Sequence, residues 1–267
     1  MTTTTINTPD GPFTFAGNST DGYFQNLQGF TSASADLIEF VRYLKPDGII
    51  LDVGANIGIT ALLMAQAAPE CEVVAFEPSP ENAAFFRENL SSEQRVRLVA
   101  SGVAEEAGEL RFLVHAGANC HAVSEDYLFA ETGSFTSVPV VTLDDEFPTG
   151  DVSFIKIDVE GFEPHVLAGA RNLIARCRPW LWMEFNSVAL NVAHGYSPMA
   201  FATGLFKTFE VFYWEDGALV PVAGPDALVH DNMVKRQSVQ DVVLKPIPGA
   251  VMPTVAEFIA PASWRRR

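Results

Sequence analysis

The 267-residue chain is long enough for one large globular domain, and its 48% hydrophobic and 19% charged residues exclude a disordered chain. A net charge of −16 repels phosphate backbones and disfavours a nucleic-acid partner, while three widely spaced cysteines lack zinc-ligand spacing. No apolar run approaches the roughly 20 residues that span a bilayer, and no secretory signal opens the chain, so we expect a cytoplasmic protein with no membrane partner.

The first segment, residues 1–45, is predicted to form an N-terminal arm and a cap helix. Residues 1–30 are polar and rich in threonine and glycine, but interspersed aromatic residues argue against full disorder. This arm either packs on the surface or caps a ligand cleft, two alternatives that the sequence leaves open. Apolar residues at helical spacing predict a helix over 34–44, and a Pro-Asp-Gly stretch at 46–48 then breaks the chain.

From residue 46 onward, strands and helices alternate. Strands are predicted over 49–53, 73–76, 96–100, 155–158, 181–185, 211–214 and 242–244, and helices over 59–67, 80–90, 163–175 and 198–206. This alternation predicts an α/β fold with a doubly wound, mostly parallel sheet that binds its ligand at the C-terminal ends of the strands. We place this domain at 46–245, with a β-hairpin insert at 109–144 and a C-terminal tail at 246–267.

The turn after the first strand, D-V-G-A-N-I-G at 52–58, predicts a cofactor site. Glycine tolerates positive φ and lets a ligand approach the bare backbone. The dinucleotide fingerprint requires a third glycine that is missing here, which disfavours an NAD-dependent dehydrogenase. An acid two residues before the first glycine suits a cationic cofactor such as S-adenosylmethionine. The alternative is a glycine turn that only packs the helix on the strand.

Glu77 ends the second strand, 19 positions after Gly58. An acid at this place can accept hydrogen bonds from the ribose hydroxyls of a nucleoside cofactor. Asn82, early in the next helix, either approaches the same cofactor or merely occupies the first helical turn.

A second candidate site follows the strand at 155–158. Asp158 and Glu160 are two carboxylates at a strand end, and one of them can take the proton of a reacting hydroxyl. His165 is a rival base, although a structural role is favoured for it. Glu184 and Asn186, after the next strand, could join Asp158 in binding Mg²⁺. A divalent metal is the less favoured expectation, and the spacing alone does not establish one.

Several stretches resemble the FkbM-family methyltransferases. They are D-V-G-A-N-I-G-I-T from Asp52, F-E-P-S-P-E-N from Phe76, V-T-L-D-D from Val141 and I-K-I-D-V-E-G-F-E from Ile155. V-L-A-G-A from Val166 and R-P-W-L-W-M-E from Arg178 continue the match, which covers about half of the chain in the right order. The resemblance implies a class I methyltransferase (Rossmann-like) fold, with a mostly parallel seven-stranded sheet, helices on both faces and a β insert. It also implies S-adenosyl-L-methionine as methyl donor and O-methylation of a sugar or natural-product hydroxyl.

The resemblance also implies roles for individual residues. The cofactor-binding set comprises Asp52, Gly54, Asn56 and Gly58 at the methionine end, Glu77 at the ribose, Pro78 and Asn82 beside it, and Ser101 and Gly102 near the adenine. Asp158 and Glu160 fall at the reactive end, Asp158 as base or orienter and Glu160 in support. The expected reaction is a single in-line displacement, in which alignment supplies much of the barrier reduction.

The expected partner is a small-molecule hydroxyl acceptor, and a homo-oligomer is compatible with the sequence. Two rival functions are a catalytically silent, cofactor-binding scaffold in a biosynthetic complex and an NAD-dependent dehydrogenase. A nucleic-acid methyltransferase is disfavoured by the acidic composition and by the lack of an N/D-P-P-Y/F stretch.

Overall fold

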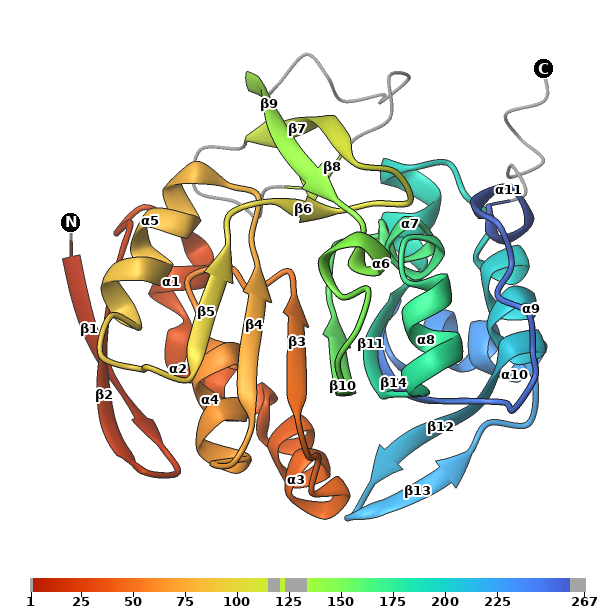
Figure 1. Ribbon diagram of the computed structural model, residues 1–267, viewed down its shortest axis with the longest axis horizontal. Helices are drawn as coiled ribbons and strands as arrows, with labels where there is room; N and C mark the ends of the chain where they lie inside the picture. The colour runs from red at the N-terminus through yellow and green to blue at the C-terminus, as the bar shows by residue number, and fades with distance from the viewer. Residues whose placement is uncertain (1, 115–120, 123–133, 260–267) are drawn as a thin grey trace.

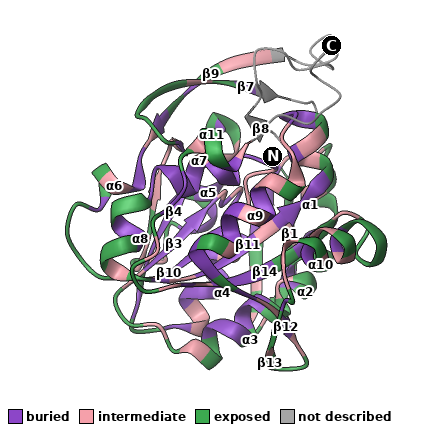
Figure 2. Cartoon of the chain, turned by 90° about the vertical axis from the view of Figure 1, so that its right-hand side faces the viewer, coloured by how far each residue is buried: buried purple, intermediate pink, exposed green. Residues whose placement is uncertain are grey.

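The computed structural model describes residues 2–114, 121–122 and 134–259. An eight-stranded sheet runs through the molecule, and two smaller sheets lie beside it (Figure 1). Buried positions follow the strands of the large sheet and the inner sides of the helices (Figure 2). Among the described residues, no helix has both the length and the apolar character needed to cross a membrane.

The large sheet has the strand order β13-β12-β14-β11-β10-β3-β4-β5. Five neighbouring strands are parallel: β5 (Val96–Val99), β4 (Glu72–Phe76), β3 (Ile49–Val53), β10 (Val152–Ile157) and β11 (Trp180–Asn186). Next, β14 (Val239–Pro246) runs antiparallel to both β11 and β12 (Phe209–Glu215). The predicted α/β class with a mostly parallel sheet is therefore confirmed.

The eighth strand, β13 (Ala218–Pro221), differs from the predicted seven-stranded sheet. It pairs antiparallel with β12 through the two-residue turn Asp216-Gly217, whose φ angles are 49° and 75°. Two successive positive φ values match the twist of a tight hairpin, and Asp-Gly is a preferred pair for it. The turn therefore adds one short edge strand to the sheet.

Helices cover both faces of the sheet, as predicted. Because side chains alternate along a strand, Ile50 and Phe154 pack in one hydrophobic cluster, and Leu51 and Ile155 in the other. The first cluster includes residues of α3 (Ala35–Leu44), α4 (Ile59–Ala67) and α5 (Pro80–Asn89). The second includes residues of α7 (Glu163–Ala168), α8 (Arg171–Cys177), α9 (Pro198–Thr208), α10 (Pro225–His230) and α11 (Val255–Phe258).

The helix predicted over 163–175 is divided into α7 and α8. Gly169 ends α7, and a Cβ added there would lie 2.0 Å from the carbonyl oxygen of Ala104. This close approach of two backbones requires glycine, and the chain changes direction at this contact. One continuous helix was therefore the wrong prediction for this segment.

The N-terminal arm is more regular than the sequence suggests. It forms a hairpin of β1 (Thr2–Thr8) and β2 (Gly11–Gly17), followed by α1 (Gly22–Gln25) and α2 (Leu27–Ala33). The side chain of Asn89 fixes the hairpin to α5, accepting from the Ala16 N–H at 2.7 Å and donating to its carbonyl at 3.2 Å.

The predicted β insert forms its own sheet, in the order β6-β9-β7-β8. It comprises β6 (Gly102–Val103), β7 (Gly108–Val114), β8 (His121–Ala122) and β9 (Ser134–Val141). β7 and β9 pair antiparallel, which confirms the hairpin character, and the sheet lies over the C-terminal ends of β3 and β4 (Figure 1).

The remaining elements of the described residues are α6 (Leu143–Glu146) and two π-helices, η2 (Ala189–Ala193) and η3 (Asp231–Lys235). Residues 260–267 of the predicted tail lie outside the described residues.

Candidate functional site

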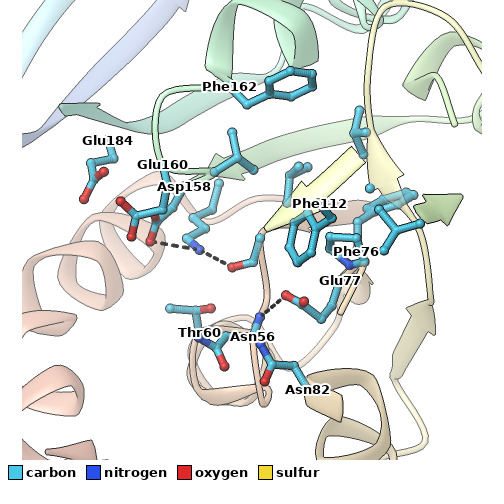
Figure 3. Close-up of a pocket in the computed structure, with 18 of the residues that line it drawn as sticks. Asn56, Thr60, Phe76, Glu77, Asn82, Phe112, Asp158, Glu160, Phe162 and Glu184 are labelled. Atoms are coloured by element: carbon cyan, nitrogen blue, oxygen red, sulfur yellow. Dashed lines mark hydrogen bonds and ion pairs between the residues drawn. The ribbon is translucent and has the colours of Figure 1, made fainter. Parts of the chain in front are cut away.

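A cavity of about 320 Å³ opens at the C-terminal ends of β3, β4 and β10. Its walls bring together the glycine turn, the residues after β4, the loop after β10 and the inner side of the insert sheet (Figure 3). This is the edge of a doubly wound sheet at which ligands bind, so the cavity lies where the strand pattern predicts a ligand.

The glycine turn shapes one wall of this cavity. Gly54 and Asn56 line it and have positive φ angles of 83° and 50°. A Cβ on Gly54 would lie 1.9 Å from the carbonyl oxygen of Asp158, so glycine is required where β3 and β10 end side by side. Gly58 is outside the lining. It precedes α4, and a Cβ there would meet the side chain of Leu90 at 2.8 Å.

Glu77 projects into the cavity from the end of β4, and its carboxylate is fixed by two backbone amides. Oε2 accepts from Asn56 N at 2.9 Å, and Oε1 accepts from Ser79 N at 2.8 Å. Burial raises the pKa of Glu77 to about 7, although these hydrogen bonds oppose the increase. Each carboxylate oxygen has a second lone pair, so the group can still accept from a ligand hydroxyl.

The other residues predicted for the cofactor divide into two groups. Pro78, Asn82 and Gly102 line the same cavity as Glu77. Ser101 is outside the lining, and its N–H donates to the carbonyl of Val99 at 2.9 Å.

Asp52 is fully buried behind the cavity wall rather than exposed to a ligand. Its Oδ2 accepts from the hydroxyl of Thr60 at 2.7 Å, and its Oδ1 lies 3.3 Å from Lys156 Nζ. Lys156 lines the cavity, and its Nζ donates to the Gly54 carbonyl at 3.0 Å and lies 3.5 Å from Asp158 Oδ2. Burial disfavours the ammonium, but the carboxylates of Asp52 and Asp158 outweigh it and raise the pKa of Lys156. This lysine, within the apolar strand I-K-I, was missed in the sequence.

Acidic side chains gather at the end of the cavity away from Glu77, where Figure 3 shows Asp158, Glu160 and Glu184. Asp158 is partly exposed, with a side-chain exposure of 42%. Glu184 accepts from the amide of Asn186 at 3.3 Å, and both residues line the cavity. Burial, followed by the charges of Asp158 and Glu160, raises the pKa of Glu184 well above its usual range. Glu184 therefore holds a proton more readily than an exposed glutamate does.

The geometry gives no support to His165 as the base or to a divalent metal site. His165, the rival base, is outside the cavity lining, and its ring nitrogens lie 2.7 Å from Glu105 Oε2 and 2.7 Å from the hydroxyl of Tyr196. Within the described ranges, no group of three or more His, Cys, Asp or Glu side chains is arranged to hold a metal ion.

Comparison with known proteins shows which family the chain belongs to. Residues 52–202, more than half of the chain, match the Methyltransferase FkbM domain. The chain belongs to this family. It is 28% identical over 185 residues to the 2-O-methyltransferase NoeI of Sinorhizobium fredii, covering 62% of this chain and 74% of NoeI. It is 27% identical over 250 residues to the 31-O-demethyl-FK506 methyltransferase FkbM of Streptomyces tacrolimicus. That alignment covers 78% of this chain and 94% of the relative. A solved methyltransferase FkbM from Methylobacillus flagellatus aligns with a TM-score of 0.45 and 16% identity, over 75% of this chain and 44% of that one.

Membership of the FkbM methyltransferase family favours methyl transfer over the dehydrogenase alternative.

In this methyltransferase, part of the cavity wall comes from residues outside the family match at 52–202. Tyr23 and Phe30, from the N-terminal arm, stack with their ring centroids 4.4 Å apart, and Val239 comes from β14. The insert adds an apolar wall, made of Leu110, Phe112, Val138 and Val140. Tyr23 and Phe30 favour the alternative in which the N-terminal arm caps the ligand cleft. Sequence reasoning missed Val239 and the four residues of the insert.

Proposed function

We propose that this protein transfers a methyl group from S-adenosyl-L-methionine to a hydroxyl of a sugar or another natural-product small molecule. The observation that carries the proposal is one cavity with a fixed carboxylate, Glu77, at one end and Asp158 and Glu160 at the other. One relative is named a 2-O-methyltransferase and another a 31-O-demethyl-FK506 methyltransferase, and both names support an oxygen acceptor. The net charge of −16 supports a small molecule rather than a nucleic acid.

The residues present fit this cofactor. Glu77 would hold the ribose, because its oriented oxygens match a pair of hydroxyl donors. Gly54 and Asn56 would hold the methionine end, and Pro78, Asn82 and Gly102 would flank the nucleoside. Asp52 would act from behind the wall by holding Lys156 at 3.3 Å. Gly58 and Ser101 lie outside the lining, so we assign them no direct contact with the cofactor.

When bound, S-adenosylmethionine supplies a methyl group that its sulfonium already activates. Asp158 would accept the proton of the attacking hydroxyl, and Lys156, 3.5 Å away, would hold its carboxylate in place. Glu160 would orient the acceptor. The insert and the N-terminal arm border the cavity and would limit the access of water.

Transfer of a labelled methyl group to a panel of sugars and macrolides tests the proposal. We expect one acceptor class to be methylated, and we expect Asp158→Asn to lower turnover by about 10²-fold or more while cofactor affinity stays nearly unchanged. Unchanged turnover in this variant would remove Asp158 from the mechanism. Protein that binds the cofactor but methylates nothing would instead support the silent scaffold.

A further inference from the structure

The loop Asp158–Gly161, between β10 and α7, carries both proposed acids in an unusual backbone conformation. Glu160 and Gly161 have positive φ angles of 56° and 94°. The left-handed region costs a non-glycine residue about 1 kcal/mol or more, so surrounding contacts must hold Glu160 there.

Glu163 supplies one set of these contacts. It is the first residue of α7 and is fully buried. Its Oε1 accepts from Gly161 N at 3.1 Å and from Val159 N at 3.3 Å. Its Oε2 is buried, and no described residue gives it a hydrogen bond. The carboxyl group is thus directed at the loop, and Glu163 is not among the residues that line the cavity.

A second set of contacts to the loop comes from η2 and the residue that follows it. His194 Nε2 lies 3.2 Å from the carbonyl oxygen of Glu160. A Cβ on Gly161 would lie 2.8 Å from the backbone carbon of Ala189 and 2.8 Å from the ring of His194. The loop is therefore in contact with both the Glu163 carboxyl group and the His194 ring, and Gly161 is too close to η2 to carry a side chain.

We propose that Glu163 is a positioning residue for methyl transfer, which fixes the Asp158–Gly161 loop through two backbone amides and so sets the direction of the Glu160 side chain. The inference rests on the proposed function, because that function gives the loop its acids. Glu163 itself does not touch the acceptor or the cofactor.

Substitutions at Glu163 can distinguish a role as hydrogen-bond acceptor from a role that depends on its charge. Burial raises the pKa of Glu163 to about 8, and the charge of Asp158 adds to this increase, while the amide hydrogen bonds oppose it. The carboxyl group is therefore mostly neutral at pH 7. Glutamine keeps a carbonyl acceptor of the same reach without the charge, whereas methionine keeps the length but loses the acceptor.

Amide hydrogen exchange in the cofactor-free protein tests the positioning directly. We expect Val159 and Gly161 to exchange at least tenfold faster in Glu163→Met than in wild type, and at wild-type rates in Glu163→Gln. Glu257→Met is the matched control, because the exposed Glu257 also accepts a backbone N–H, that of Thr254 at 2.8 Å, at the start of α11. It should leave the exchange of Val159 and Gly161 unchanged. If Glu163→Met does not fold, Glu163→Ala removes the same acceptor with a smaller side chain.

Kinetics with the acceptor found for the wild type completes the test. Glu163→Met should lower kcat at least tenfold with less than a twofold change in S-adenosylhomocysteine affinity, and it should cause no further loss in a Glu160→Gln background. Unchanged exchange in Glu163→Met, or equal kcat losses in the Met and Gln variants, would overturn the proposal. A wild type that methylates nothing would contradict the proposed function alone, and the exchange rates would still decide whether Glu163 holds the loop.

Discussion

Lys156 is the residue on which the charge balance of the cavity depends. Among the described residues that line the cavity, Lys156 is the cation beside four acids, and it lies between Asp52 at the end of β3 and Asp158 after β10. Asp52 is fully buried, so its charge is tolerable only with this partner and the Thr60 hydroxyl.

Lys156→Met should therefore be strongly destabilising. Removing one partner of a buried ion pair costs about 3–5 kcal/mol, because the remaining charge is left uncompensated. Lys245→Met is the matched control: Lys245 lies 3.2 Å from Glu210 on the surface, and loss of an exposed pair costs up to about 1 kcal/mol. Urea denaturation measures both losses, and equal losses would show that the buried Asp52–Lys156 pair carries no special stability.

The buried acids Glu77 and Glu163 should make the protein less stable as the pH rises. Their folded-state pKa values are raised to about 7 and about 8, above the ordinary 4.5, so the folded state binds more protons than the unfolded state between these limits. The unfolding free energy should fall from about pH 5 to about pH 8. Glu163→Gln should remove about 2 kcal/mol or more of that fall. Parallel pH curves for wild type and variant would contradict this.

At the scale of residues, sequence reasoning found the groups that follow strands and missed those defined by contacts. Glu77 and Asp158 end or follow predicted strands, so their place at the cavity could be expected. Lys156 and Glu163 matter because of partners that only the folded chain brings close. Asp52 illustrates the same limit, because its side chain is directed at Lys156 rather than into the cavity.

At the scale of elements, the meeting of β3 and β10 fixes the geometry of the site. The turn at Gly54 and the carbonyl of Asp158 are too close to admit any side chain at position 54. The same contact brings the glycine turn and the proposed acids to one cavity wall.

Gly54→Ala should destabilise the protein by about 3 kcal/mol or more, since a steric clash adds to the cost of a left-handed alanine. Gly150→Ala is the control, because Gly150 has a similar φ of 97° but no atom within 4 Å of an added Cβ. It should lose only about 1 kcal/mol. Thermal and urea unfolding measure the difference, and similar losses at both positions would argue against the clash.

Periodic elements were predictable, and irregular ones were not. The helix at 59–67 was predicted with its exact bounds, because apolar spacing and the preceding glycine define it locally. The β1–β2 hairpin was missed, since β1 is rich in threonine and the two strands bury few apolar side chains. The break at Gly169 depends on Ala104, which is distant in sequence.

At the scale of the whole molecule, three parts of the chain surround one cavity: the N-terminal arm, the insert sheet and the methyltransferase sheet. The alternation of strands and helices was sufficient to predict the sheet and its ligand edge. It could not predict that Tyr23, Phe112 and Val239 would meet there, because their proximity arises from tertiary packing. The arm and β14 lie outside the family match at 52–202, although both contribute residues to the cavity wall.

The most direct test of the central claim, that the cavity between Glu77 and Asp158 binds the methyl donor, is calorimetric titration with S-adenosylhomocysteine. We expect saturable binding of one equivalent, no binding of NAD under the same conditions, and affinity at least tenfold weaker in Glu77→Ala with the fold intact. Absence of binding at millimolar ligand, or equal affinity in the Glu77→Ala protein, would contradict the account.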